Sequence, residues 1–103
     1  MDENWELTEI IEACVAGEQE GLARLVDMYG KRIYGYFYRL TGQRATSEDL
    51  LSELFLKLIG KIHSFNAKKG AFDNWLFRVA SNVFYDYLRK QQRRKKALDK
   101  RVE

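Results

Sequence analysis

The chain has 103 residues, of which 46% are hydrophobic and 32% are charged, and it contains no proline. This length fits one domain, and the hydrophobic fraction is typical of a globular protein and excludes a disordered one. No apolar run is long enough to span a membrane, the acidic N-terminus lacks the features of a signal peptide, and the single cysteine cannot form an internal disulfide, so we expect a cytoplasmic protein.

The formal net charge of +3 is distributed unevenly along the chain. Residues 1–30 carry eight acidic residues and one basic residue, whereas residues 31–103 carry 17 basic and seven acidic residues. Between Arg89 and Arg101, eight basic residues accompany one acidic residue. Such an asymmetry indicates a polyanion near the C-terminal half. On charge alone, a solvated tail that aids solubility is an equally good interpretation.

Apolar residues recur at steps of three and four along most of the chain, which predicts helices. The first predicted helix covers residues 7–16, and Gly17 ends it. The second covers residues 18–40, where three glycines lower its intrinsic stability by up to about 1 kcal/mol each. The inward-facing residues of these two helices are predicted to be Leu7, Ile10, Ile11, Cys14, Val15, Leu22, Leu25, Val26, Tyr29, Ile33, Tyr36, Phe37 and Leu40.

The third predicted helix covers residues 46–62, and its start resembles a capping box formed by Thr46 and Asp49. Residues 63–70 have no periodicity and are predicted to form a loop. The fourth helix is predicted over residues 71–94. The core residues of these two helices are predicted to be Leu50, Leu51, Leu54, Phe55, Leu58, Ile59, Ile62, Phe72, Trp75, Leu76, Val79, Ala80, Val83, Phe84, Tyr87 and Leu88.

These elements predict an all-α fold, a compact bundle of about four helices. Residues 1–95 are expected to form the helical domain. Residues 96–103 are expected to form a basic tail or the start of a linker.

The loop and the fourth helix bring together residue types that bind single-stranded nucleic acid. Aromatic rings stack on bases, cations neutralise phosphates, and amides read the edge of an unpaired base. The candidates are Phe65, Asn66, Lys68 and Lys69 in the loop and Arg78, Asn82, Tyr85 and Arg89 on one helix face. Alternatively, Phe65 covers the core and Tyr85 packs on a neighbouring element, since aromatic residues mostly serve cores.

The outer face of the third helix is a second candidate surface. Asp49 and Glu53 flank Leu56, an apolar residue outside the core stripe. A protein partner with basic helices fits such a surface, although a solvent-facing surface with one stray leucine is common.

Catalytic, metal and cofactor sites are not expected. The only histidine, His63, and the only cysteine, Cys14, are far apart in sequence, and no paired ligand spacing occurs. No glycine-rich phosphate loop or nucleophile set can be assembled, so we expect that the chain is not an enzyme.

Several segments of the chain resemble one protein family. Residues 47–56 read SEDLLSELFL and resemble the AED-L-x-Q-E-x-F-L helix of bacterial sigma factors. Residues 72–82 read FDNWLFRVASN and resemble the segment F-x-x-W-L-x-R-I-A-x-N, and residues 85–90 resemble the x-D-x-L-R-R that follows it. With LVDMY at 25–29 and LTG at 40–42, the resemblance covers about residues 18–95 and is nearest to region 2 of the extracytoplasmic-function class.

The resemblance implies two partners. The helix over residues 46–62 would bind the β′ clamp helices of core RNA polymerase through Asp49, Ser52, Glu53 and Leu56. The family usually has glutamine where Ser52 stands. An anti-sigma factor is left open as a further partner.

The resemblance also implies how promoter DNA is bound. Residues 63–70 and the next helix would capture a flipped base of the single-stranded, non-template −10 element. Phe65, Asn66 and Asn82 match that pocket, and Arg78, Arg89 and Lys90 match the face that follows the DNA backbone. The family continues into a second helical domain that reads the −35 element, in which case the basic end would begin an interdomain linker.

Two other functions fit the same residues. One is a protein-interaction module that occupies the polymerase clamp without reading DNA, which would not need Phe65, Asn66 or Asn82. The other is a nonspecific helical DNA-binding domain, for which duplex and single-stranded DNA would bind equally well.

Overall fold

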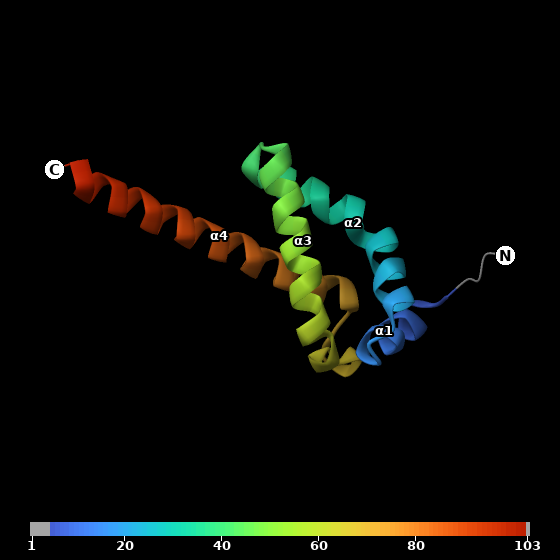
Figure 1. The fold of residues 1–103 in the computed structure, drawn as a ribbon. Coiled ribbons are helices and arrows are strands. Elements are labelled where there is room, and N and C mark those ends of the chain that lie inside the picture. The colour runs from blue at the N-terminus through green and yellow to red at the C-terminus, as the bar shows by residue number, and fades with distance from the viewer. Residues whose placement is uncertain (1–4, 103) are drawn as a thin grey trace.

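The computed structural model describes residues 5–102 and consists of helices joined by short connections (Figure 1). Its elements are α1 (Leu7–Val15), α2 (Gln19–Thr41), α3 (Arg44–Lys61) and α4 (Phe72–Val102), with two short 3-10 turns, η1 (Ile62–Ser64) and η2 (Ala67–Lys69), between α3 and α4. No strand occurs in this range, which confirms the all-α prediction. The first four residues of the expected domain and Glu103 of the expected tail lie outside the described residues.

Two of the predicted helix ends are wrong. α3 begins at Arg44, after Gln43, so Thr46 is not its cap; the Thr46 hydroxyl instead donates a hydrogen bond to Oε1 of Gln43 over 2.8 Å. α4 continues to Val102, well past the predicted end at residue 94. No glycine or proline interrupts residues 72–102, and the lysines and arginines there favour helix, so nothing stops the helix earlier.

The core lies between α2, α3 and the first half of α4. Its most deeply buried side chains include Leu25, Ile33 and Phe37 of α2, Leu54 and Leu58 of α3, and Leu76 and Val83 of α4. These residues were all predicted to face inward, and they recur at the helical spacing that the sequence shows.

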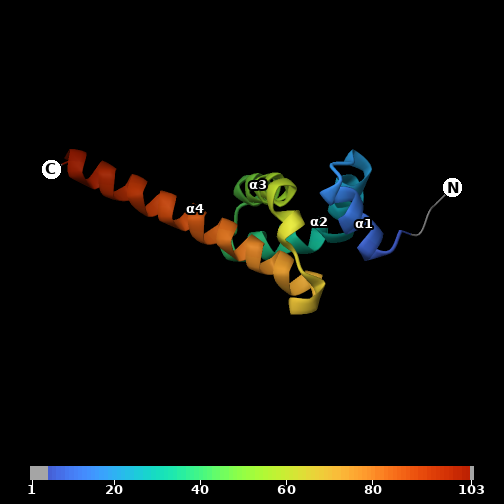
Figure 2. The same cartoon turned by 90° about the horizontal axis from the view of Figure 1, so that it is seen from below.

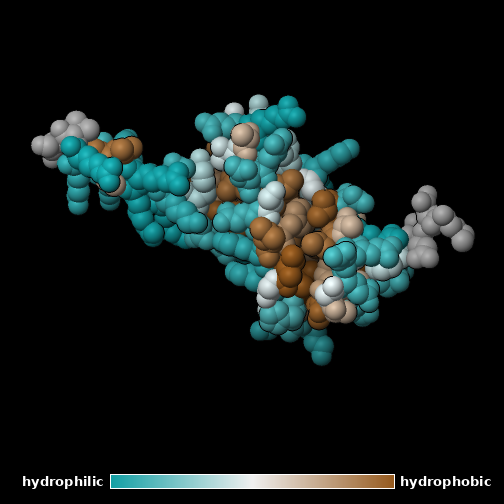
Figure 3. All heavy atoms as spheres, in the orientation of Figure 1, coloured by the Kyte–Doolittle hydropathy of each residue, from teal (hydrophilic) through white to brown (hydrophobic). Residues whose placement is uncertain are grey.

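Four residues that were predicted to face inward are exposed. They are Val15, Val26, Leu40 and Ile59. Each lies at the border of its apolar stripe, where no described element covers it. A shallow groove lined by Leu22, Leu58 and Ile62 runs beside Ile59. Figure 3 shows this apolar surface between the lower part of α3 and the corner of α1 and α2.

Three side-chain hydrogen bonds join α4 to α2 and α3. The Tyr29 hydroxyl donates to Asp73 over 2.5 Å, and the hydroxyls of Tyr36 and Ser81 lie 2.8 Å apart. The Lys57 ammonium donates to Asp86 from α3 over 3.2 Å. Beyond these contacts α4 projects away from the other helices, as both views show (Figure 1, Figure 2), and the molecule measures 61 × 28 × 22 Å. No helix within the described range is both long and apolar enough to cross a membrane.

Candidate nucleic-acid interface

A hollow of about 270 Å³ lies where the η1–η2 segment meets the start of α4. We call it the base hollow. It is lined by Ser64, Phe65, Asn66, Lys69, Gly70, Ala71, Asn74, Trp75 and Arg78. Four of the predicted DNA-binding residues, Phe65, Asn66, Lys69 and Arg78, are therefore brought together around one opening.

The aromatic wall of the base hollow is continuous with the core. The ring of Phe65 meets that of buried Phe72 edge-on at 5.1 Å between centroids, and the ring of Trp75 lies 5.6 Å from each of them. Phe65 and Trp75 are half-buried, so each packs on the core and still presents part of its ring to the hollow. Both interpretations of Phe65, as core cover and as binding surface, are compatible with this arrangement.

Local backbone geometry holds the loop that forms the rim. The Asn66 side chain accepts a hydrogen bond from the backbone N–H of Lys68 over 2.9 Å, which orders η2. Gly70 follows with φ of +150°, a conformation that side-chain-bearing residues rarely adopt, and it turns the chain into α4. Because only Oδ1 of Asn66 is engaged within the described structure, its amide nitrogen can still donate to a ligand.

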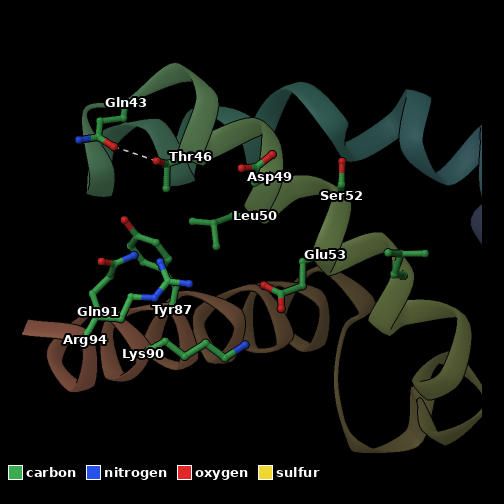
Figure 4. Close-up of a pocket in the computed structure, with 11 residues that line it drawn as sticks. Gln43, Thr46, Asp49, Leu50, Ser52, Glu53, Tyr87, Lys90, Gln91 and Arg94 are labelled. Atoms are coloured by element: carbon green, nitrogen blue, oxygen red, sulfur yellow. Dashed lines mark hydrogen bonds between the residues drawn. The ribbon is translucent and has the colours of Figure 1, made fainter. Parts of the chain in front are cut away.

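A second and larger concavity, of about 720 Å³, separates α3 from the middle of α4 (Figure 4). We call it the α3–α4 groove. Its α3 side carries the four predicted polymerase-binding residues, Asp49, Ser52, Glu53 and Leu56, and its α4 side carries Tyr87, Lys90, Gln91 and Arg94. Leu56 lines the same wall and is 70% exposed, so an apolar side chain is open to solvent beside the acidic ones.

Comparison with known proteins identifies the family. The model of the family Sigma-70 region 2 matches residues 25–94. The chain belongs to the sigma-70 region 2 family.

The curated relatives are much longer than this region 2 domain. The ECF RNA polymerase sigma factor BldN of Streptomyces coelicolor is 36% identical over 83 residues, which cover 81% of this chain and 31% of BldN. The ECF RNA polymerase sigma factor SigW of Bacillus subtilis is 36% identical over 76 residues, which cover 74% of this chain and 40% of SigW. The matched part of the chain thus spans only 31% of the length of BldN and 40% of the length of SigW.

A solved structure shares the fold over almost the whole chain. It is an NMR structure of an engineered region 2 of sigmaE in complex with GTAAAA. It superposes with a TM-score of 0.78 at 28% sequence identity, and the match covers 91% of this chain and 97% of that one. The predicted fold, a region 2-like helical bundle, is confirmed.

The remaining predicted DNA-binding residues of this region 2 domain lie outside the base hollow. Asn82 and Tyr85 are exposed on α4, and their spacing from Arg78 places them on the same helix face. Lys68 is exposed on η2. Asn82 therefore stays a candidate for contacts along the strand, but the structure does not bring it to Phe65 and Asn66.

Arg89 and Lys90 are neighbours in sequence but have different surroundings. Arg89 pairs with Asp86 on its own helix, and Asp86 also accepts the hydrogen bond from Lys57. The hydrogen bond from Lys57 is the main cause that lowers the pKa of Asp86, and Arg89 acts in the same direction. Lys90 instead lines the α3–α4 groove.

Asn74 is a lining residue of the base hollow that the sequence pattern did not single out. It lies one helical turn before Arg78, on the same face as Arg78 and Asn82. The spacing of four residues between Asn74, Arg78 and Asn82 is the sequence signal that could have identified Asn74. Trp75 was predicted as a core residue only, and it both packs on the core and lines the base hollow.

Nothing in the described part of the chain resembles a metal centre. Across residues 5–102, no group of three or more histidine, cysteine, aspartate or glutamate side chains could hold a metal ion. Cys14 is half-buried between helices, and burial raises the pKa of its thiol, which keeps it in the unreactive thiol form.

Proposed function

We propose that this sigma region 2 domain binds core RNA polymerase and holds the single-stranded non-template DNA of the promoter −10 element, so that the promoter melts and transcription starts. The observation that carries the proposal is the base hollow, in which aromatic rings, amides and cations surround one opening in a chain of this family. The activity is binding rather than catalysis, and it would take place in the cytoplasm.

The base hollow has the chemistry that an unstacked base requires. The exposed parts of Phe65 and Trp75 provide ring faces, and a stacked base contributes about 1–3 kcal/mol. Asn66 and Asn74 offer amides to the edge of the base. Since extruding a base from a duplex costs a few kcal/mol, one captured base offsets much of the cost of melting at that position.

The α4 face beyond the base hollow would guide the strand. Arg78, Asn82, Tyr85 and Arg89 follow one another at steps of three and four, so they form a line that leads away from the hollow. Arg78 lies at the junction, because it belongs both to this line and to the lining of the base hollow. Lys68 and Lys69 add positive charge at the rim, where the phosphates of a bound strand would pass.

The α3 side of the α3–α4 groove would dock on the polymerase. Asp49 and Glu53 would guide a basic segment of the β′ clamp helices, and Leu56 would be buried on binding. Ser52 lies between them on the same wall, in place of the longer glutamine that is usual in the family.

The test measures DNA binding and polymerase binding separately. Binding of a labelled single-stranded oligonucleotide containing GTAAAA is measured by fluorescence anisotropy, and binding of core RNA polymerase is measured in parallel. Asn74→Ala and Asn66→Ala are expected to weaken oligonucleotide binding roughly 10-fold, the equivalent of one lost base contact, and to leave polymerase binding unchanged. Asn82→Ala is expected to weaken oligonucleotide binding more than polymerase binding.

The matched control is Glu53→Arg on the other surface. It is expected to weaken polymerase binding and not oligonucleotide binding. If Asn66→Ala and Asn74→Ala reduce both activities equally, or neither, the base hollow is not the DNA site. Equal affinity of the unmodified protein for duplex and single-stranded DNA would favour a nonspecific DNA-binding domain instead.

A further inference from the structure

The α3–α4 groove has walls of opposite charge. Asp49 and Glu53 line it from α3, while Lys90 and Arg94 line it from α4 (Figure 4). None of these four side chains forms an ion pair within residues 5–102, although other charged residues of α3 and α4, such as Lys57 and Asp86, do so. The groove therefore presents two unpaired acidic and two unpaired basic groups across an open space.

The basic residues of α4 divide into two faces. Tyr87, Lys90 and Arg94 are separated by steps of three and four and share the face that lines the groove. Arg89, Arg93 and Lys96 are likewise separated by steps of four and three, and they continue the line of Arg78, Asn82 and Tyr85. The positive charge of α4 is thus not one surface for DNA, because part of it is turned toward α3.

Leu98 extends the groove face along α4. It follows Arg94 by one turn, and at 61% exposure it is the large apolar side chain that stands out among the charged residues at the end of the helix. With Leu56 exposed on the opposite wall, the groove face combines apolar side chains with charge, as protein-docking surfaces do.

The charges of the walls restrict what can occupy the groove. A nucleic acid strand would meet the carboxylates of Asp49 and Glu53, and a uniformly basic segment would meet Lys90 and Arg94; like charges brought together in this way disfavour binding. A protein helix with basic side chains on one flank and acidic side chains on the other complements both walls.

We infer that α4 forms the second half of the polymerase-docking site, and that Lys90 and Arg94 bind an acidic flank of the same polymerase segment whose basic flank meets Asp49 and Glu53. This inference rests on the proposed docking of α3 on the polymerase. It moves Lys90 from the DNA-binding surface, where the family resemblance placed it, to the protein-binding surface. Tyr87 and Gln91 lie on the same wall and would contact the bound segment between the two charged positions.

The experiment compares two charge reversals on different faces of α4. The variant Lys90→Glu/Arg94→Glu changes the groove face, and Arg93→Glu/Lys96→Glu makes the same change of charge on the other face. All four side chains are exposed, so both variants are expected to fold, as circular dichroism and thermal melting would show. Each variant is titrated with core RNA polymerase and, separately, with the GTAAAA-containing oligonucleotide.

The groove-face variant is expected to lose about 10-fold or more in polymerase affinity, with a larger loss at low salt, and to lose less oligonucleotide affinity than the other variant. The variant on the other face is expected to show the reverse pattern. A milder version, Lys90→Gln/Arg94→Gln, removes the positive charges without adding negative ones and is expected to give a smaller loss of polymerase affinity in the same direction.

The outcomes separate this inference from the proposed function. If Glu53→Arg weakens polymerase binding while the groove-face variant binds like the unmodified protein, α3 docks alone and the inference is wrong. If the two double variants lose polymerase affinity equally, the effect is one of net charge and the inference is also wrong. If neither Glu53→Arg nor the groove-face variant affects polymerase binding, the proposed docking itself fails.

Discussion

At the scale of single residues, Tyr29 links the core to the start of α4. Its ring is buried against Phe72 at 5.7 Å, and its hydroxyl donates to Asp73, which also faces Arg32 at 3.6 Å. Burial, followed by the hydrogen bond and the negative charge of Asp73, raises the pKa of Tyr29 from 10.0 to about 12, and Arg32 opposes this in part. The network lies next to the base hollow, because Asp73 directly precedes Asn74 and Trp75 of its lining.

Replacing Tyr29 by phenylalanine should reveal this network. Tyr29→Phe keeps the ring and removes one hydrogen bond, so the free energy of unfolding is expected to fall by about 1 kcal/mol at neutral pH. Because the pKa of Tyr29 is higher in the folded than in the unfolded state, its contribution is full below pH 10 and is lost as the pH rises toward 12.

Urea denaturation of both proteins at neutral pH and between pH 10 and 12 measures this difference. The two stabilities are expected to converge as the pH rises. Tyr38→Phe, at a tyrosine that is 47% exposed, serves as the control and is expected to cost little. A difference between Tyr29→Phe and the unmodified protein that stays constant up to pH 12 would contradict the assignment.

At the scale of elements, α1 is held against α2 by a close approach at Gly21. A Cβ atom at this position would lie 2.7 Å from Cβ of Ala13 and 2.8 Å from the backbone nitrogen of Cys14. Both distances are well below ordinary contact, and a backbone atom cannot move aside as the end of a flexible side chain can. Gly21 therefore contributes through packing, even though glycine lowers the intrinsic stability of a helix.

Two glycine-to-alanine changes in α2 should have opposite effects. Gly21→Ala is expected to lower the free energy of unfolding by about 1–3 kcal/mol, because α1 must shift away from α2. Gly35→Ala is the matched control. No neighbouring group lies within 4 Å of a Cβ atom added at this position, so the variant should raise the free energy of unfolding by about 0.5–1 kcal/mol. Thermal or denaturant unfolding measures both, and a loss of stability in both variants would show that α2 tolerates no added methyl group at either position.

The helices themselves could be predicted because their apolar stripes are long and regular. Leu25, Ile33 and Phe37 recur at helical spacing, and all of them are buried in the core. The end of α4 could not be predicted, because the apolar pattern fades after Leu88 while the helix continues on intrinsic propensity alone. The start of α3 was misplaced because the side chain of Thr46 bonds Gln43 instead of capping the helix.

The sequence predicted the types of residue in the candidate sites, but not which of these residues lie together in the structure. Helical spacing placed Asp49, Glu53 and Leu56 on one face, and they do line one wall. Arg89 and Lys90 have different surroundings because of the way α4 is rotated about its axis relative to α3. The sequence pattern of one helix does not contain this information. The place of Asn74 in the base hollow depends on how the loop folds back at Gly70, which is tertiary information as well.

At the scale of the whole molecule, α4 connects all the candidate surfaces. Its start lines the base hollow, and its middle separates the face of Arg78, Asn82 and Tyr85 from the α3–α4 groove. Its final turns extend beyond the other helices, and every side chain from Lys90 to Arg101 is exposed. The acidic residues of the chain are concentrated at the opposite end, in and around α1. A polyanion is therefore attracted to one end of the molecule and repelled by the other.

This polarity predicts the salt dependence of DNA binding. For single-stranded DNA, each phosphate that a protein cation neutralises contributes about 0.7 to the slope of log affinity against log salt. Arg93→Gln/Lys96→Gln removes two cations from the face that continues the line of Arg78, so the slope is expected to become shallower by up to about 1.4. Lys90→Gln/Arg94→Gln removes the same charge from the groove face and should change the slope less, because those side chains are turned toward α3. Oligonucleotide titrations across a series of salt concentrations measure both slopes. Equal changes in the two variants would mean that the strand responds to the total charge of α4, and not to one of its faces.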